Sequence, residues 1–195
     1  MLTEADRTTL AEAGITNLDH LASAAAAFLR AHPVYAAAPV TNALSVAEEH
    51  YLRGAGARGI GVWSEAQAAD NVAIIAGEFA QMVTTALTQK AAAERLGVST
   101  SRVRQKLEAG ELYAVRATGG RVCPRFQFGP NGTLPGLEVV LRALRPEAHP
   151  VAVQRFFMDT HPDLASDTLG RTLSPHEWLL TGHPPAAVVD LAREV

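Results

Sequence analysis

Residues 88–128 read TQKAAAERLGVSTSRVRQKLEAGELYAVRATGGRVCPRFQF, and this stretch decides the fold. Small and apolar residues recur at helical spacing up to Leu96, where Gly97 breaks the pattern. A hydroxyl side chain at position 99 or 100 can cap a second helix, in which Val103 and Leu107 lie four residues apart and face inward. Gly110 then ends that helix, because glycine readily adopts positive φ. The pattern predicts two short helices joined by a tight turn.

Two runs typical of β-strands follow the second predicted helix. They cover residues 112–117 and 122–128, and the pair Gly119-Gly120 between them suits a hairpin turn. Helix, turn, helix and basic hairpin, in this order, predict a winged helix-turn-helix. The alternative is that the same elements pack together as a core and contact no nucleic acid.

The polar side chains of this segment are placed as DNA binding requires. The second helix offers long hydrogen-bonding side chains near its N-terminal end, where a helix can enter the major groove. The hairpin places arginines, Arg125 among the candidates, beside phosphates. The predicted DNA-binding residues are Lys90, Ser101, Arg102, Arg104, Gln105, Lys106, Arg116 and Arg121.

The formal net charge of −3 hides a strong asymmetry. Residues 88–145 hold ten Lys or Arg and four Asp or Glu, a net +6, which leaves −9 on the rest of the chain. A basic segment within an acidic chain is what a local DNA-binding module predicts. The acidic flanks are then available for protein contacts.

The same segment resembles the small DNA-binding domains of the MerR/excisionase group. The resemblance rests on the pattern A-x-x-L-G-V-S-x-x-x-V-R-x-x-x-x-x-G-E-L, which runs from Ala93 to Leu112. It implies a winged helix-turn-helix over residues 88–145, with the helix after the hairpin included. Double-stranded DNA, as an operator, is the partner that this resemblance implies.

Residues 1–87 are rich in alanine and show helical periodicity. Thr3 can cap the first helix, with Asp6 in the capping-box position. The expected helices cover residues 3–14, 17–32, 41–53 and 64–87. The last has a wide apolar stripe that needs a second surface to cover it, either the rest of the bundle or another subunit. We therefore predict a helical N-terminal domain, residues 1–87, and a homo-oligomer as one way to cover the stripe.

A glycine-rich stretch over residues 54–61 matches G-x-G-x-x-G. A dinucleotide site would need a strand before the first glycine and a helix after the third. Residues 46–53 instead favour a helix, so we interpret the stretch as a loop. An enzyme that binds a nucleotide here is the weakest hypothesis.

The C-terminal part, residues 146–195, predicts a small helical domain. An apolar helix covers residues 151–158, and Ser174 begins another as N-cap, with Pro175 at the first helical position and Glu177 completing a capping box. Gly182 ends that helix, and a last one follows. Trp178 is either a core residue or the anchor of an interface.

This region resembles the toxin-binding domain of antitoxins of the Xre/MbcA/ParS type. The matching residues are Pro162, Leu164, Ser174, Pro175, Glu177, Trp178, Leu179, Gly182, Val189 and Ala192. The link over residues 126–144 is similar to DNA-binding partners of RES-domain toxins. The resemblance implies a cognate toxin as partner, contacted through Trp178, Leu179, Leu180, Val188 and Val189. One departure is that the familiar DNA module is of the Xre type, whereas this one looks winged.

The sequence offers no pattern for catalysis, metal binding or a cofactor. A single cysteine, Cys123, excludes an intramolecular disulfide framework and fits a reducing cytoplasm. The histidines show no tight ligand pair, so we predict no metal site. No apolar run approaches membrane length, and we expect a cytoplasmic protein that is not an enzyme and has no cofactor.

The fold class predicted is mainly α: an N-terminal helical bundle, a central winged helix-turn-helix with a β-hairpin, and a small C-terminal helical domain. The function predicted is that of a DNA-binding antitoxin in a type II toxin–antitoxin system, which neutralises a RES-type toxin and represses its own operon. The alternative is a stand-alone dimeric winged-helix regulator of transcription.

Overall fold

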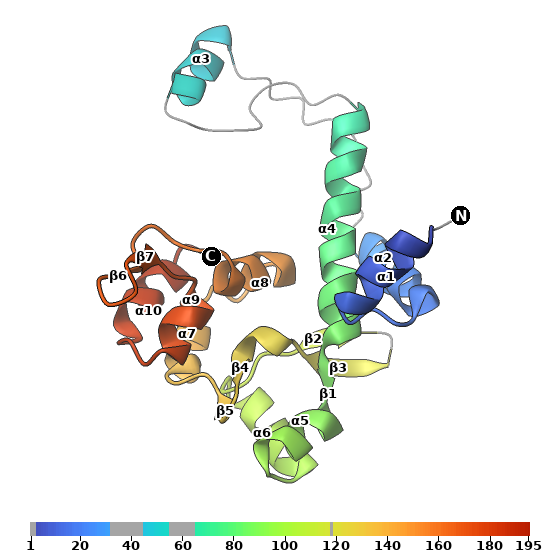
Figure 1. Ribbon diagram of the computed structural model, residues 1–195, viewed down its shortest axis with the longest axis vertical. Coiled ribbons are helices and arrows are strands. Elements are labelled where there is room, and N and C mark those ends of the chain that lie inside the picture. The colour runs from blue at the N-terminus through green and yellow to red at the C-terminus, as the bar shows by residue number, and fades with distance from the viewer. Residues whose placement is uncertain (1–2, 32–44, 55–64, 118) are drawn as a thin grey trace.

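The computed structural model describes residues 3–31, 45–54, 65–117 and 119–195. Within these ranges the chain is mainly helical, as predicted, with short strands in three small sheets (Figure 1). The glycine-rich stretch 54–61 lies outside the described residues from position 55 onward.

The N-terminal helices are α1 (Glu4–Glu12), α2 (Leu18–Ala31), α3 (Val46–Gly54) and α4 (Glu65–Thr85). The predicted capping box is present at α1, where Thr3 and Asp6 bond each other's backbone N–H groups. Helix α2 lies beside the C-terminal half of the long α4 (Figure 1), and the rings of Phe28 and Phe79 meet with centroids 5.0 Å apart. The apolar stripe of α4 is therefore covered in part by the chain's own bundle.

The central segment consists of β1 (Leu87–Thr88), α5 (Gln89–Leu96), α6 (Thr100–Glu108), β2 (Val115–Ala117) and β3 (Gly120–Cys123). The strands form one antiparallel sheet in the order β1-β3-β2. The predicted hairpin is present, but its strands are shorter than the sequence indicated, because residues 125–127 form a 3-10 turn, η2 (Arg125–Gln127). A third strand, β1, joins the sheet from the residues that follow α4.

A link of turns and short pairs leads to the C-terminal helices. Its elements are β4 (Phe128–Gly129), β5 (Gly132–Thr133) and α7 (Leu137–Ala143). The chain continues through α8 (Pro150–Met158), β6 (Ala165–Ser166), β7 (Arg171–Thr172), α9 (Pro175–Leu180) and α10 (Ala186–Ala192). The capping box predicted at Ser174 is present, with Pro175 in the first turn.

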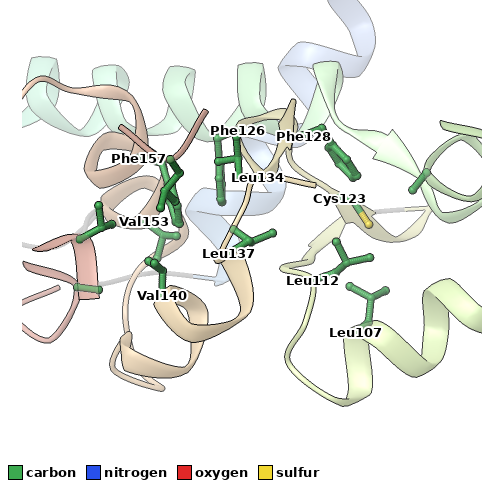
Figure 2. Packing of buried hydrophobic residues seen from close by; sticks show 14 of the residues in the cluster. Leu107, Leu112, Cys123, Phe126, Phe128, Leu134, Leu137, Val140, Val153 and Phe157 are labelled. Atoms are coloured by element: carbon green, nitrogen blue, oxygen red, sulfur yellow. The ribbon is translucent and has the colours of Figure 1, made fainter. Parts of the chain in front are cut away.

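One hydrophobic cluster runs through the central segment and the C-terminal helices. Val103 and Leu107 of α6 belong to the same cluster as Phe126, Phe157 of α8 and Val188 of α10. Figure 2 shows this continuity, with the Phe126 and Phe157 rings stacked at 4.6 Å between centroids. The two parts predicted as separate domains, 88–145 and 146–195, therefore share a core in this fold.

Candidate nucleic-acid interface

The turn between α5 and α6 is built by local interactions. Gly97 ends α5 with φ of 65°, a left-handed conformation that glycine adopts at little cost. The Ser99 hydroxyl accepts a hydrogen bond from the Arg102 N–H at 3.2 Å and so caps α6. Val103 and Leu107 are buried, which fixes the face of α6 that points to the core. The opposite face of α6 is consequently turned to solvent.

That outer face carries the predicted DNA-binding side chains. Successive residues of a helix are about 100° apart, so Ser101 and Gln105 lie opposite the buried Val103. Arg102 and Arg104 flank them, and all four are exposed. Arg102 and Arg104 donate to neutral amide oxygens and not to carboxylates in the hydrogen bonds that they make. The Arg102 Nη1 donates to the Gln105 Oε1 at 3.2 Å, and the Arg104 Nε donates to the Gln89 Oε1 at 3.3 Å. Their positive charge is therefore not offset by a carboxylate in these contacts.

The two predicted lysines differ in their surroundings. Lys90 is exposed in the first turn of α5, close to the Gln89 that bonds Arg104. Lys106 instead forms an ion pair with Glu111, with its Nζ 2.7 Å from the carboxylate Oε2. The hydrogen bond from Lys106 holds the pKa of Glu111 below its usual value. The side chain of Lys106 is thus turned to the segment after α6 and away from the outer face.

The hairpin β2–β3, which we call the wing, brings its two arginines together. Arg116 of β2 and Arg121 of β3 are direct cross-strand partners and are both exposed. Residues directly opposite in an antiparallel pair lie on the same face of the sheet. Two like charges in these positions repel each other, and an anion bound near both would relieve that repulsion. The pair is placed as a phosphate contact requires.

Arg125 lies elsewhere than the sequence suggested. Its Nε donates to the Thr85 carbonyl at 2.6 Å, so it holds the C-terminal end of α4 to the segment after the wing. Arg125 lies in η2 after the wing and its Nε is engaged with the backbone, while its role as a phosphate contact stays a prediction.

Cys123, at the end of β3, is a buried strand residue. Burial raises the pKa of its thiol, and the nearby positive charge of Arg121 opposes the rise only in part. A thiol kept protonated within the core is a poor nucleophile. The residue contributes packing beneath the wing.

Sequence reasoning missed the residue that ties the wing to α6. Gln127 is fully buried, and its side-chain amide bonds the backbone of Tyr113, between α6 and β2, and the carbonyl of Pro124. A glutamine in an aromatic run gave no periodic signal for such a role. It holds the segment before β2 in place and so helps to fix the wing relative to α6.

The predicted toxin contacts are only partly at the surface. Leu179 and Val188 are completely buried in the shared core, so in this fold their side chains are not available at the surface to cover a partner. Leu180 is exposed, whereas Trp178 and Val189 are half-buried. The Trp178 indole N–H donates to the Pro184 carbonyl at 2.8 Å, and its ring stacks on that of His183. Both contacts join α9 to the segment between α9 and α10.

Among the described residues, no three His, Cys, Asp or Glu side chains gather as metal ligands would. In the same ranges, none of the helices combines the length and the apolar character needed to span a membrane.

Comparison with known proteins identifies the central segment. Residues 80–128 match the family model described as DNA-binding protein Rv2175c, wHTH domain. The DNA-binding protein Rv2175c of Mycobacterium tuberculosis (strain ATCC 25618 / H37Rv) is 47% identical over 53 residues, which are 25% of this chain and 36% of that protein. The chain thus matches little more than a third of that relative's length. The NMR structure of Rv2175c is 28% identical to this chain, with a TM-score of 0.44, and the match covers 56% of this chain and 79% of that one.

Residues 80–128 are therefore a winged helix-turn-helix domain similar to that of Rv2175c, and the predicted fold of this segment is confirmed. None of these matches supports the predicted resemblance to antitoxins.

Proposed function

We propose that this chain is a non-enzymatic DNA-binding protein with a regulatory role, in which the Rv2175c-like winged helix-turn-helix at residues 80–128 contacts double-stranded DNA. The relative's name describes it as DNA-binding. The support within this chain is the geometry of α6 and the wing. The observation that carries the proposal is the cross-strand pair Arg116 and Arg121 beside a helix whose outer face is polar and exposed.

In the proposed complex, the N-terminal part of α6 enters the major groove. Ser101, Arg102 and Gln105 then face base edges, where arginine and glutamine side chains can form paired hydrogen bonds. Arg104 and Lys90 lie toward the start of α5 and contact the phosphate backbone. These roles follow from the placement of each side chain on its helix.

The wing supplies the second set of contacts. Arg116 and Arg121 engage phosphates of one strand, which positions the domain without reading the sequence. Lys106 contributes positive potential near the interface but remains paired with Glu111. Most of the affinity would then come from the phosphate contacts of Arg116 and Arg121, whereas the sequence specificity would come from the base contacts of α6.

Fluorescence anisotropy with a labelled duplex tests the proposal. The whole chain is titrated onto a duplex of about three helical turns, between about 50 and 200 mM salt. We expect binding that weakens steeply with salt, because bound arginines and lysines release condensed counterions. Selection from a random duplex library then tests for a preferred sequence. Absence of binding at the lowest salt would contradict the proposal.

The finer antitoxin function stays a prediction that rests on the resemblance of residues 146–195 alone. Its sharpest test is co-expression of this chain with the product of the adjacent open reading frame. Rescue of growth together with a stable complex would favour it, whereas the absence of both would favour the stand-alone regulator. Of the predicted contact residues, Leu180 is the exposed one to substitute.

Homo-oligomerisation also stays a prediction. Ile74 of α4 is 54% exposed, on a helix whose C-terminal half already packs against α2. A dimer through α4 would cover such a residue. Sedimentation equilibrium of the wild-type chain and of Ile74→Glu tests it, and a wild-type chain that stays monomeric at high concentration would exclude it.

A further inference from the structure

A largely apolar cavity of about 370 Å³ lies between the N-terminal helices and the wing. Its walls come from α2, α4 and β2, with Pro150 at the start of α8 closing one side. In Figure 1, α2 and the C-terminal end of α4 stand next to the strands β2 and β3. The volume is within the range of about 300–1,000 Å³ that is usual for small-molecule sites, near its lower end.

One charged residue lines the cavity. Phe28 and Phe79 make an aromatic wall and alanines of α2 leave the space open, whereas Arg116 is the only charged residue among the described residues that line it. No acidic side chain lines it within the same part of the chain. Charge complementarity therefore selects a ligand with an apolar body and an anionic head.

The backbone of Arg116 adds a second polar contact. Ala117 and Gly120 are the cross-strand pair that flanks the two-residue turn, which is the hydrogen-bonded position in such a hairpin, so Arg116 and Arg121 occupy the next, non-hydrogen-bonded position. Because β2 is an edge strand, the N–H and C=O of Arg116 point away from β3 to its free edge. The cavity is lined by this same strand. Because side chains alternate along a strand, that of Arg116 starts on the face opposite Val115 and Ala117 and meets a bound anion around this free edge, where its N–H also points.

We propose that this cavity binds a small monocarboxylate with an apolar body, and that the bound acid weakens DNA binding by neutralising Arg116. The second half rests on the proposed function, because it requires Arg116 to contact phosphate. The carboxylate accepts from Arg116 while the hydrocarbon part packs on Phe28 and Phe79. A bound anion removes the attraction of that arginine for the DNA backbone.

Octanoate, with octan-1-ol as the matched uncharged probe, tests the site in the full chain. Amide NMR spectra of the labelled protein report binding at Phe28, Val115 and Arg116 without any DNA present. We expect saturable shifts of these amides with octanoate and an affinity at least about tenfold weaker for octan-1-ol. In Arg116→Gln the two probes should bind alike. Shifts that do not saturate, or that fall elsewhere, overturn the proposal.

Ala27→Phe is the variant that fills the cavity. Ala27 lines the cavity without belonging to the buried cluster beneath it. This variant should lose octanoate binding while its thermal midpoint and its affinity for the duplex stay unchanged. Ala27→Leu serves in its place if the phenylalanine impairs folding. Retained octanoate binding in the folded variant would contradict the site.

Anisotropy with the labelled duplex tests separately whether the bound acid weakens DNA binding. Octanoate should weaken DNA binding of the wild-type chain and leave that of Ala27→Phe unchanged. If the wild type binds DNA and octanoate independently, the coupling is wrong although the site stands. If no DNA is bound at all, the proposed function fails, and the NMR titration still decides the ligand site.

Discussion

The side-chain amide of Gln127 satisfies both backbone polar groups of Tyr113. The Tyr113 N–H donates to the Gln127 Oε1 at 2.8 Å, and the Gln127 Nε2 donates to the Tyr113 carbonyl at 2.8 Å. The same Nε2 also donates to the Pro124 carbonyl at 3.0 Å. The amide thus joins the chain that leaves α6 to the chain that leaves the wing, much as a paired strand would.

Gln127→Leu should destabilise the fold by about 2–4 kcal/mol, because it leaves three backbone partners of the amide without their hydrogen bonds. Chemical denaturation measures the free energy of unfolding. Gln154→Leu on α8 is the matched control, since Gln154 is half-buried, and should change stability by less than about 1 kcal/mol. Equal effects of the two variants would argue against the role of Gln127.

Arg121→Ala should weaken DNA binding of any sequence and reduce the slope of log K against log salt by about 0.9, the value for one phosphate contact. The measurement is anisotropy of the labelled duplex at several salt concentrations. Arg193→Ala is the matched control, because it makes the same change of net charge at an exposed residue that follows α10. There Arg193 pairs with Asp190. If the two variants lower the slope equally, Arg121 acts only through net charge and the wing contact is wrong.

Gly136→Ala should destabilise the protein by at least about 3 kcal/mol. Gly136 has φ of 70°, and an added Cβ would collide with the Pro185 ring that precedes α10. Gly182→Ala is the control: Gly182 has φ of 81° but open space around it, so only the conformational cost of about 1–2 kcal/mol applies. Thermal unfolding distinguishes the two variants, and similar losses would mean that the Pro185 ring does not lie against Gly136 as it does in this structure.

Glu177 couples stability to pH. The side-chain hydrogen bonds from Arg171, at 2.8 and 3.0 Å, are the main cause that lowers the pKa of Glu177 to about 2, and the Ser174 N–H adds to the effect. Since the folded pKa lies below the unfolded value of about 4.3, this stabilisation is present at neutral pH and is lost as the pH falls from about 4.5 to about 2.

Glu177→Gln should therefore lower stability at pH 7 and lose this part of the pH dependence. The difference is about 1 kcal/mol or less, because the side chain is 37% exposed and solvent screens the pair. Denaturation of both proteins between pH 7 and pH 2 measures it. Glu194→Gln is the control and should follow the wild-type curve of stability against pH. A Glu177→Gln curve that runs parallel to the wild-type curve would contradict the role given to Glu177.

Local rules predicted the parts of the fold that local interactions decide. Ser99 and Ser174 cap helices as expected, because a cap needs only residues within one turn. Val103 and Leu107 are buried because their spacing places them on one face of α6. The exposure of Arg104 and Arg121 followed from the same spacing and from the hairpin register.

Contacts between distant residues could not be predicted in this way. The pairing of Leu87 with Cys123 and the bond of Arg125 to Thr85 join positions far apart in the sequence. The apolar spacing of Leu179 and Val188 showed a hydrophobic face but not that this chain's own core covers it. Gln127 has a buried polar role that depends wholly on where the backbone of Tyr113 lies.

The most direct test of the account is an amide NMR titration of the labelled chain with duplex DNA at low salt. We predict that the largest shifts fall on Ser101, Arg102 and Gln105 of α6 and on Arg121 of the wing. Shifts confined to α8, α9 and α10, with α6 and the wing unchanged, would contradict it.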